Sequence, residues 1–307
     1  MLVSGIEILD KAHKNSYGVG AFNFVNYEML SAIFEAANEA NAPIIVQASE
    51  GAIKYLGIDV MIGMVRTLST RYEHIPVSLH LDHGTTFKIC KRAVESGFTS
   101  VMIDASHLPF NENLSITSEV VKMAHNDGVS VEAELGRLMG IEDNVDVSES
   151  DATLVNPKEA ELFVRESKID YLAPAIGTSH GAFKFRGEPK LDFDRLKEVK
   201  RVTNIPLVLH GASTIPDYVK DAFLSSGGDL KNSKGVPSTF IQDAIRGGIN
   251  KVNIDTDLRI AFMAEVRRVV KEDNSQFDLR KFFAPGKESV KRLIVERIKL
   301  LGSDSKI

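Results

Sequence analysis

The sequence has little of what several classes of protein require. It carries a single cysteine, Cys90, in 307 residues, which excludes an intrachain disulfide and a cysteine-rich zinc module. It has no apolar run close to the roughly 18 residues that a membrane-spanning helix needs. The first residues have neither a basic start nor a long apolar stretch, so we expect no signal peptide. These absences predict a cytoplasmic chain in a reducing compartment, without a membrane partner.

Positive charge is not in excess either. Lysine and arginine number 37 against 42 aspartate and glutamate residues, which gives a net charge of −5. This balance argues against a nucleic-acid partner bound on a broad basic face. Only binding through a local basic patch stays possible. The hydrophobic share of 43% excludes an intrinsically disordered chain, and the length is sufficient for a large core.

Short apolar segments alternate along the chain with segments whose apolar residues recur at helical spacing. This pattern predicts an α/β fold, a (β/α)8 TIM barrel with extra C-terminal helices, and residues 1–307 as a single domain. A doubly wound open sheet is the alternative, but no Gly-x-Gly-x-x-Gly turn follows the first strand. The predicted strands are residues 19–24, 43–48, 77–82, 100–104, 130–135, 171–176, 206–210 and 251–255.

Three of the eight histidines stand where predicted strands end. They are His83, His180 and His210. The carboxyl ends of TIM-barrel strands surround the active site, so these side chains can converge there. Three imidazoles with an open fourth position are typical of a catalytic Zn²⁺ or similar divalent ion. Three unrelated loop histidines are the other interpretation.

Carboxylates also gather at the predicted strand ends, namely Asp82, Asp104, Glu134 and Asp255. Four acids on one rim repel one another unless a positive charge neutralises them, and a metal ion would do so. A ring of salt bridges or loop caps is the alternative. Asp82 precedes His83 directly, so it can reach the substrate while its neighbour binds metal, which makes it the best candidate for a general acid or base.

Small residues follow the last three predicted strands, in segments 177–181, 211–213 and 253–256. Loops at this place in TIM barrels often bind phosphate through backbone N–H groups, so the pattern favours a phosphorylated sugar as the substrate.

Two other kinds of TIM-barrel enzyme fit the sequence poorly. A metal-dependent amidohydrolase needs a His-x-His at the end of the first strand, and this chain has none there. A Schiff-base aldolase needs a lysine near the carboxyl end of a strand, whereas Lys251 stands at the beginning of its strand. His80, inside the third strand, is expected in the core.

Taken together, these segments resemble class II, metal-dependent fructose-bisphosphate aldolases. Tagatose-bisphosphate aldolases share most of them but often have a second histidine after Leu-Asp-His, where this chain has Gly84. The resemblance implies reversible cleavage of fructose 1,6-bisphosphate in glycolysis and gluconeogenesis. A phosphate-binding or structural barrel without catalysis is the non-enzymatic alternative. The matching segments are residues 18–26 (GVGAFNFVN), 80–84 (HLDHG), 100–108 (SVMIDASHL), 130–136 (SVEAELG), 171–181 (YLAPAIGTSHG), 207–213 (LVLHGAS) and 251–259 (KVNIDTDLR).

The resemblance also assigns roles to residues of the site. It implies that His83, His180 and His210 bind the catalytic Zn²⁺ and that Asp82 removes the proton from the substrate's 4-hydroxyl. Asp104 and Glu134 match residues that can hold a second or displaced divalent ion, and loop carbonyls match a monovalent cation site for Na⁺ or K⁺. The residues that match substrate-binding groups are Gly181, Gly211, Ser213, Asn253 and Thr256 for the 1-phosphate, Lys184 beside them, Asp255 for a hydroxyl, and Asn23, Ser49 and Arg280 for the other half of the substrate.

Two long connections, residues 136–156 and 227–239, are too long for ordinary loops and suggest functional segments. The first connection is acidic. Its Glu142 is the candidate that would donate a proton to C3 of the product enediolate. The alternative is that this connection is only a solvent-exposed acidic loop. Arg280 lies beyond the last strand and its helix, so it has no obvious route into its own site. By the resemblance it crosses a subunit interface, which predicts a homodimer or homotetramer.

Overall fold

The computed structural model describes residues 1–137, 139–142, 145–147, 153–180, 191–230 and 236–307. Eight parallel strands close into a barrel in the order β1-β11-β10-β8-β5-β4-β3-β2. This closed sheet confirms the predicted TIM barrel and excludes the open sheet. The strands are β1 (Val19–Asn23), β2 (Ile44–Ser49), β3 (Val77–Gly84), β4 (Ser100–Ile103), β5 (Ser130–Leu135), β8 (Tyr171–Pro174), β10 (Leu207–Leu209) and β11 (Ile249–Ile254).

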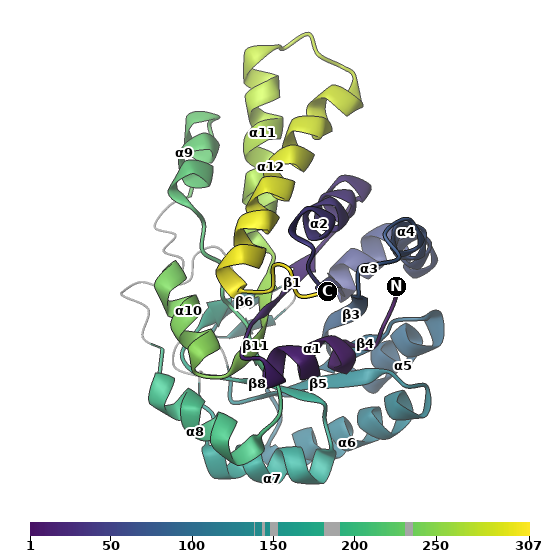
Figure 1. Ribbon diagram of the computed structural model, residues 1–307, viewed down its shortest axis with the longest axis vertical. Coiled ribbons are helices and arrows are strands. Elements are labelled where there is room, and N and C mark those ends of the chain that lie inside the picture. The colour runs from purple at the N-terminus through teal and green to yellow at the C-terminus, as the bar shows by residue number, and fades with distance from the viewer. Residues whose placement is uncertain (138, 143–144, 148–152, 181–190, 231–235) are drawn as a thin grey trace.

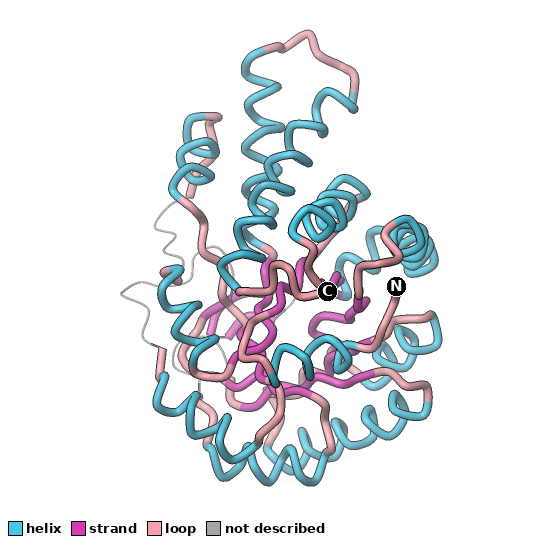
Figure 2. Tube along the Cα trace, viewed as in Figure 1, coloured by secondary structure: helices cyan, strands magenta, loops and turns pink. Residues whose placement is uncertain are grey.

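Helices surround the barrel, so the strands in Figure 2 form an inner ring inside an outer layer of helices. Apolar residues on the inner helix faces and on the outward faces of the strands make the main core between the two layers. None of the helices in the described part of the chain has the length and hydropathy to cross a membrane. The helices are α1 (Gly5–Lys14), α2 (Tyr27–Ala40), α3 (Glu50–Leu56), α4 (Ile58–Arg71), α5 (Phe87–Ser96), α6 (Phe110–Asn126), α7 (Pro157–Ser167), α8 (Phe193–Thr203), α9 (Asp217–Ser225), α10 (Ser238–Arg246), α11 (Thr256–Glu272) and α12 (Leu279–Leu301).

Helix α1 closes the amino-terminal end of the barrel. Its buried residues Ile8 and Leu9 belong to a second, smaller apolar cluster with Val19 and Tyr171 of the barrel strands. This cluster fills the base of the barrel, so only the opposite end, where the strands have their carboxyl ends, is left for a site.

The predicted C-terminal helical segment is one helix, α12, which forms an arm with α11. Figure 1 shows this pair projecting from the barrel, with the turn between them at the far end. Along this arm the rings of Phe262 in α11 and Phe283 in α12 lie 5.8 Å apart between centroids. The other end of α12 buries Leu293, Ile294 and Ile298 in the main core, so α12 also belongs to the barrel's outer layer.

The connection 136–156 contains structure that the sequence did not predict. Strands β6 (Met139–Glu142) and β7 (Val145–Val147) pair antiparallel, and β6 also pairs with β9 (Ser179–His180) in a separate small sheet. Helices α1, α3 and α10 were also missed. The small sheet joins the connection after β5 to the connection after β8.

Candidate active site

Asp82 lies at the carboxyl end of β3 and is held by three side-chain amides. Nδ2 of Asn23 and Nε2 of Gln47 donate to its Oδ2 at 2.8 and 3.3 Å. Nδ2 of Asn253 donates to its Oδ1 at 3.1 Å. The amide of Gln47 also donates to Oδ1 of Asn23 at 2.6 Å, so donors from β1, β2 and β11 converge on one buried carboxylate. Gln47 was not predicted as a site residue.

His83 follows Asp82 and also contacts groups of the barrel mouth, although successive strand residues normally point to opposite faces. The pairing of β3 with β4 shifts register between Leu81 and Gly84, and His83 has a left-handed φ of +50°. This irregularity turns His83 toward β4 and β10. Gly84 is required beside it, because a Cβ there would lie 2.7 Å from the carbonyl oxygen of Met102.

The imidazoles of His83 and His210 lie edge to face, with ring centroids 4.7 Å apart. Nδ1 of His83 lies 2.8 Å from Oδ2 of Asp104, and Nδ1 of His210 lies 3.4 Å from Oε2 of Glu134. One ligand atom each from His83, Glu134 and His210 lie within 4.8 Å of one another. Two imidazoles and a carboxylate at this spacing fit the donor set of a Zn²⁺ ion.

Buried neighbours shift the proton equilibria of Asp104 and His210. Burial would raise the pKa of the Asp104 carboxyl, but the hydrogen bonds and charge of His83, with the hydrogen bonds of Ser106, hold that pKa below its usual range. Burial would lower the pKa of His210, but the hydrogen bond to Glu132 and the nearby Glu134 carboxylate raise it to about 9.

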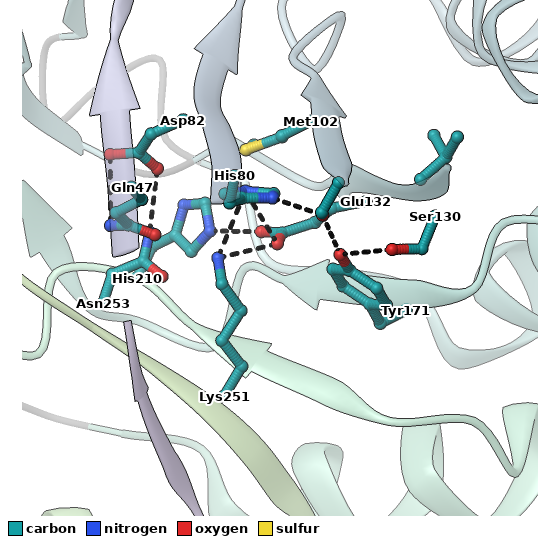
Figure 3. A network of polar contacts seen from close by, with 12 residues as sticks. Gln47, His80, Asp82, Met102, Ser130, Glu132, Tyr171, His210, Lys251 and Asn253 are labelled. Carbon is teal, nitrogen blue, oxygen red and sulfur yellow. Dashed lines mark hydrogen bonds and ion pairs between the residues drawn. The ribbon is translucent and has the colours of Figure 1, made fainter. Parts of the chain in front are cut away.

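Glu132 and Lys251 form a buried ion pair next to His210. This ion pair was not predicted from the sequence. Oε2 of Glu132 lies 2.8 Å from Nζ of Lys251, and Oε1 lies 2.7 Å from Nε2 of His210 (Figure 3). Burial would raise the pKa of Glu132, but the Lys251 ammonium and the His210 hydrogen bond lower it below its usual range. The signal in the sequence was the spacing, because Glu132 and Glu134 share one face of β5. His80, as expected, is buried in the core, where burial and then Lys251 lower its pKa well below the usual value.

The loop after β10 is held by a second buried ion pair. Nη2 of Arg297 lies 3.1 Å from Oδ2 of Asp257, and the same oxygen accepts the backbone N–H of Thr214 at 3.0 Å. Nη2 of Arg297 also donates to the carbonyl oxygen of Thr214. Gly211 has a φ of +62°, and the buried Ser213 accepts a backbone hydrogen bond from Val236. The small-residue loop thus has a defined shape beside the N-terminus of α11.

The remaining predicted residues lie at different distances from this centre. Ser49 caps α3 and lines a surface pocket with Tyr55 and Arg259. Asp255 and Thr256 begin α11, and Oδ1 of Asp255 accepts from Nε of Arg259 at 2.7 Å. Arg280 lies in the first turn of α12, with 91% of its side chain exposed and an ion pair to Asp278. The structure describes only the backbone of His180 in β9 and of Glu142 in β6, and Gly181 and Lys184 lie outside the described residues.

Comparison with known proteins gives similarity over the whole chain. The family model described as "Fructose-bisphosphate aldolase class-II" matches residues 3–306. The chain is 72% identical over 307 residues to a fructose-bisphosphate aldolase of Helicobacter pylori (strain ATCC 700392 / 26695), covering 100% of both. It is 48% identical over 303 residues to one of Thermus caldophilus, covering 99% of both. A crystal structure of the YdjI aldolase from Escherichia coli K12 superposes with a TM-score of 0.81 at 33% identity, covering 100% of this chain and 99% of that one.

Proposed function

The chain belongs to the class II fructose-bisphosphate aldolase family, and from that premise we propose how its own residues carry out the reaction. It catalyses the reversible cleavage of fructose 1,6-bisphosphate into dihydroxyacetone phosphate and glyceraldehyde 3-phosphate, a step of glycolysis and gluconeogenesis. We propose the cytoplasm as its location, with residues 1–307 as one catalytic domain. The observation that carries the mechanism is the cluster of His83, Glu134 and His210 next to the immobilised Asp82.

The metal of this family is proposed here to be Zn²⁺, held by His83, His180 and His210. Glu134 has a carboxylate oxygen within reach of the same position, which supports its predicted role for a displaced ion. Asp104 is predicted to hold a second divalent ion, and its contact with His83 also supports a role in orienting that ring. When bound, Zn²⁺ supplies a Lewis acid for the negative charge that cleavage leaves on the substrate's C2 oxygen. A monovalent cation, Na⁺ or K⁺, on loop carbonyls completes the proposed set.

Asp82 is proposed to remove the proton from the substrate's 4-hydroxyl. Each carboxylate oxygen can accept two hydrogen bonds. Among the described residues Oδ2 of Asp82 accepts two and Oδ1 accepts one, from Asn253, so Oδ1 has room for the hydroxyl. As that proton moves to Oδ1, the C3–C4 bond breaks, its electron pair stays on C3, and the aldehyde leaves. Asn23 is proposed to contact the substrate as well as Asp82.

The other residues are proposed to bind phosphate or to supply the final proton. The loop at Gly211 and Ser213, the first turn of α11 at Thr256, and Asn253 would bind the 1-phosphate, together with Gly181 and Lys184. Asp255 would accept from a substrate hydroxyl, and Ser49 would contact the other half of the substrate. Glu142 would protonate C3 of the enediolate when the connection after β5 covers the site.

We propose that Arg280 acts in the site of a neighbouring subunit, in a homodimer or homotetramer. Its place at the far end of the α11–α12 arm supports this, since α12 begins at the end away from its own barrel (Figure 1). A guanidinium suits the role because its planar fork binds phosphate at two points.

An aldolase assay with and without chelator tests the proposed metal mechanism. Treatment with EDTA should abolish cleavage, and Zn²⁺ or Co²⁺ should restore it. Borohydride with dihydroxyacetone phosphate should not inactivate the enzyme, because no lysine imine forms. Assays with the two epimeric substrates should show faster cleavage of fructose 1,6-bisphosphate than of tagatose 1,6-bisphosphate. Chelator-resistant activity that borohydride destroys would contradict the proposal.

A further inference from the structure

The barrel interior holds charges that the steps above do not use. Glu132 and Lys251 are both fully buried, at 0% exposure, where TIM barrels ordinarily have branched apolar side chains. Bringing each ion out of water costs several kcal/mol, and apolar replacements of buried ion pairs are often neutral or stabilising. Stability alone therefore gives no reason for this pair, and its contacts must be considered.

The contacts of Glu132 lead to the metal-binding group. In Figure 3 its carboxylate contacts both the imidazole of His210 and the ammonium of Lys251. A carboxylate only accepts hydrogen bonds, so Nε2 of His210, at 2.7 Å from Oε1, carries a hydrogen. The lone pair of the neutral ring is then on Nδ1. That nitrogen lies on the side of Glu134, whose Oε2 is 3.4 Å away.

His83 has the same arrangement with its nitrogens exchanged. Its Nδ1 lies 2.8 Å from Asp104, which leaves Nε2 for the metal. A carboxylate behind each histidine ligand fixes its tautomer and orientation, and loss of such a partner typically weakens metal binding 10–100-fold.

Lys251 keeps Glu132 in this position. Its ammonium lies 2.8 Å from Oε2 of Glu132 and 3.4 Å from Nε2 of His80. Nδ1 of His80 lies 2.6 Å from Oγ of Ser100, and Ser100 contacts the hydroxyl of Tyr171. The contact with His80, which is itself held by Ser100, therefore fixes the position of the Lys251 ammonium. Its ion pair with Glu132 in turn prevents that carboxylate from rotating.

We propose that Glu132 is a positioning residue for the metal centre, which accepts the Nε2 hydrogen of His210 so that Nδ1 of that ring faces the metal, with Lys251 holding Glu132 in place. The proposal rests on the metal centre described under the proposed function. It adds two residues that contact neither substrate nor metal and predicts that the two described histidine ligands use opposite nitrogens.

Two double variants of the full chain test it, Glu132→Gln with Lys251→Met and Glu132→Leu with Lys251→Met. Both remove the buried charges and keep similar volumes, and they differ in whether residue 132 offers an acceptor to His210. We expect the glutamine variant to bind Co²⁺ with nearly unchanged affinity in chelator competition. The leucine variant should bind about 10–100-fold more weakly, with an altered visible spectrum of bound Co²⁺. Equal affinities and spectra in the two variants would overturn the proposal.

A matched control lies in the same network. Tyr171→Phe removes a hydroxyl from the end that does not touch His210, so Co²⁺ affinity should not change. If Tyr171→Phe loses as much Co²⁺ affinity as the leucine double variant, the effect belongs to the whole network, and the specific role of Glu132 is overturned. Failure of the unmodified chain to bind Co²⁺ would instead contradict the metal centre itself.

One measurement needs no variant and covers the case in which the double variants do not fold. In the ¹⁵N-histidine spectrum of the Zn²⁺-loaded unmodified chain, the ring proton of His210 should be on Nε2 and that of His83 on Nδ1. A proton on Nδ1 of metal-loaded His210 would overturn the proposal.

Discussion

Nδ2 of Asn253 lies 3.1 Å from Oδ1 of Asp82, and this hydrogen bond joins β11 to β3, which are not neighbours in the barrel. With Asn23 and Gln47 on the other oxygen, the carboxylate has one orientation before any substrate arrives. A base held at its working geometry avoids reorganisation during the reaction. The amides of β1, β2 and β11 therefore fix the orientation of the proposed base before substrate binds.

We expect Asp82→Ala to separate the base from the metal centre. Cleavage should fall about 10²-fold or more, the usual contribution of a general base, while zinc content is retained. Exchange of the C3 proton of dihydroxyacetone phosphate should be affected less, because exchange involves no 4-hydroxyl. Assays of cleavage, exchange and bound zinc on one preparation check this. Equal losses of cleavage and exchange would show that Asp82 has another role.

Glu142→Ala should slow C3 proton exchange and leave zinc content unchanged, because the residue is proposed to deliver a proton and not to bind metal. Asp146→Ala is the matched control, since Asp146 lies in the opposing strand of the same hairpin. Exchange measured by loss of label from dihydroxyacetone phosphate should distinguish the two variants. A normal rate in Glu142→Ala would indicate a solvated loop acid.

Arg280→Ala should raise KM for the bisphosphate and change exchange with dihydroxyacetone phosphate little. Mixed with Asp82→Ala, it should recover some cleavage, because a hybrid dimer has one site with both groups intact. Arg246→Ala, which removes another exposed arginine paired with an aspartate, is the control and should not change KM. A fully active monomer in sedimentation, or no recovery after confirmed subunit exchange, contradicts the action in trans.

Arg297→Met should destabilise the chain and weaken phosphate binding together. Removing one partner of a buried ion pair costs about 3–5 kcal/mol because the other charge is left uncompensated, here that of Asp257. The carbonyl oxygen of Thr214 loses its hydrogen bond from Arg297, and the Asp257 carboxylate that accepts the N–H of Thr214 loses its partner charge, so KM for the bisphosphate should rise. Denaturant unfolding and steady-state kinetics measure the two effects, with Arg292→Met, an exposed position of the same helix, as control. An unchanged KM would separate the ion pair from the phosphate loop.

Cys90 should not react with thiol reagents in the folded chain near pH 8.5. Burial raises its pKa from 9.0 to about 12, so the thiolate is scarce and enclosed. Because the folded state holds this proton more tightly, its contribution to stability is full below about pH 9 and is lost as the pH rises toward 12. The loss should reach about 2 kcal/mol near pH 10.5.

Labelling with and without guanidinium, and unfolding curves at pH 8 and 10.5, check the Cys90 prediction. Cys90→Ala should show a smaller decrease of stability with pH than the unmodified chain. Rapid labelling of the native chain would show that the thiol is accessible.

The order of strands and helices could be predicted from the sequence because each barrel strand is covered on both faces and each outer helix on one. Those local patterns gave all eight strands to within a few residues. The small sheet of β6, β7 and β9 could not be predicted, since β9 pairs with β6, from which it is separated in sequence by β7, α7 and β8. Such pairing depends on where the closed barrel brings the two connections, not on local preference.

The side chains that stand at the strand ends of the site could be predicted from the sequence, because a strand's end can be recognised from local residue patterns. Tertiary structure decided what they contact. Asp82 and His83 are adjacent and would alternate in a regular strand, and the register shift before Gly84 brings both to the barrel mouth. Glu132 and Lys251 are 119 residues apart, and two buried charges are tolerated only because barrel closure places them in contact.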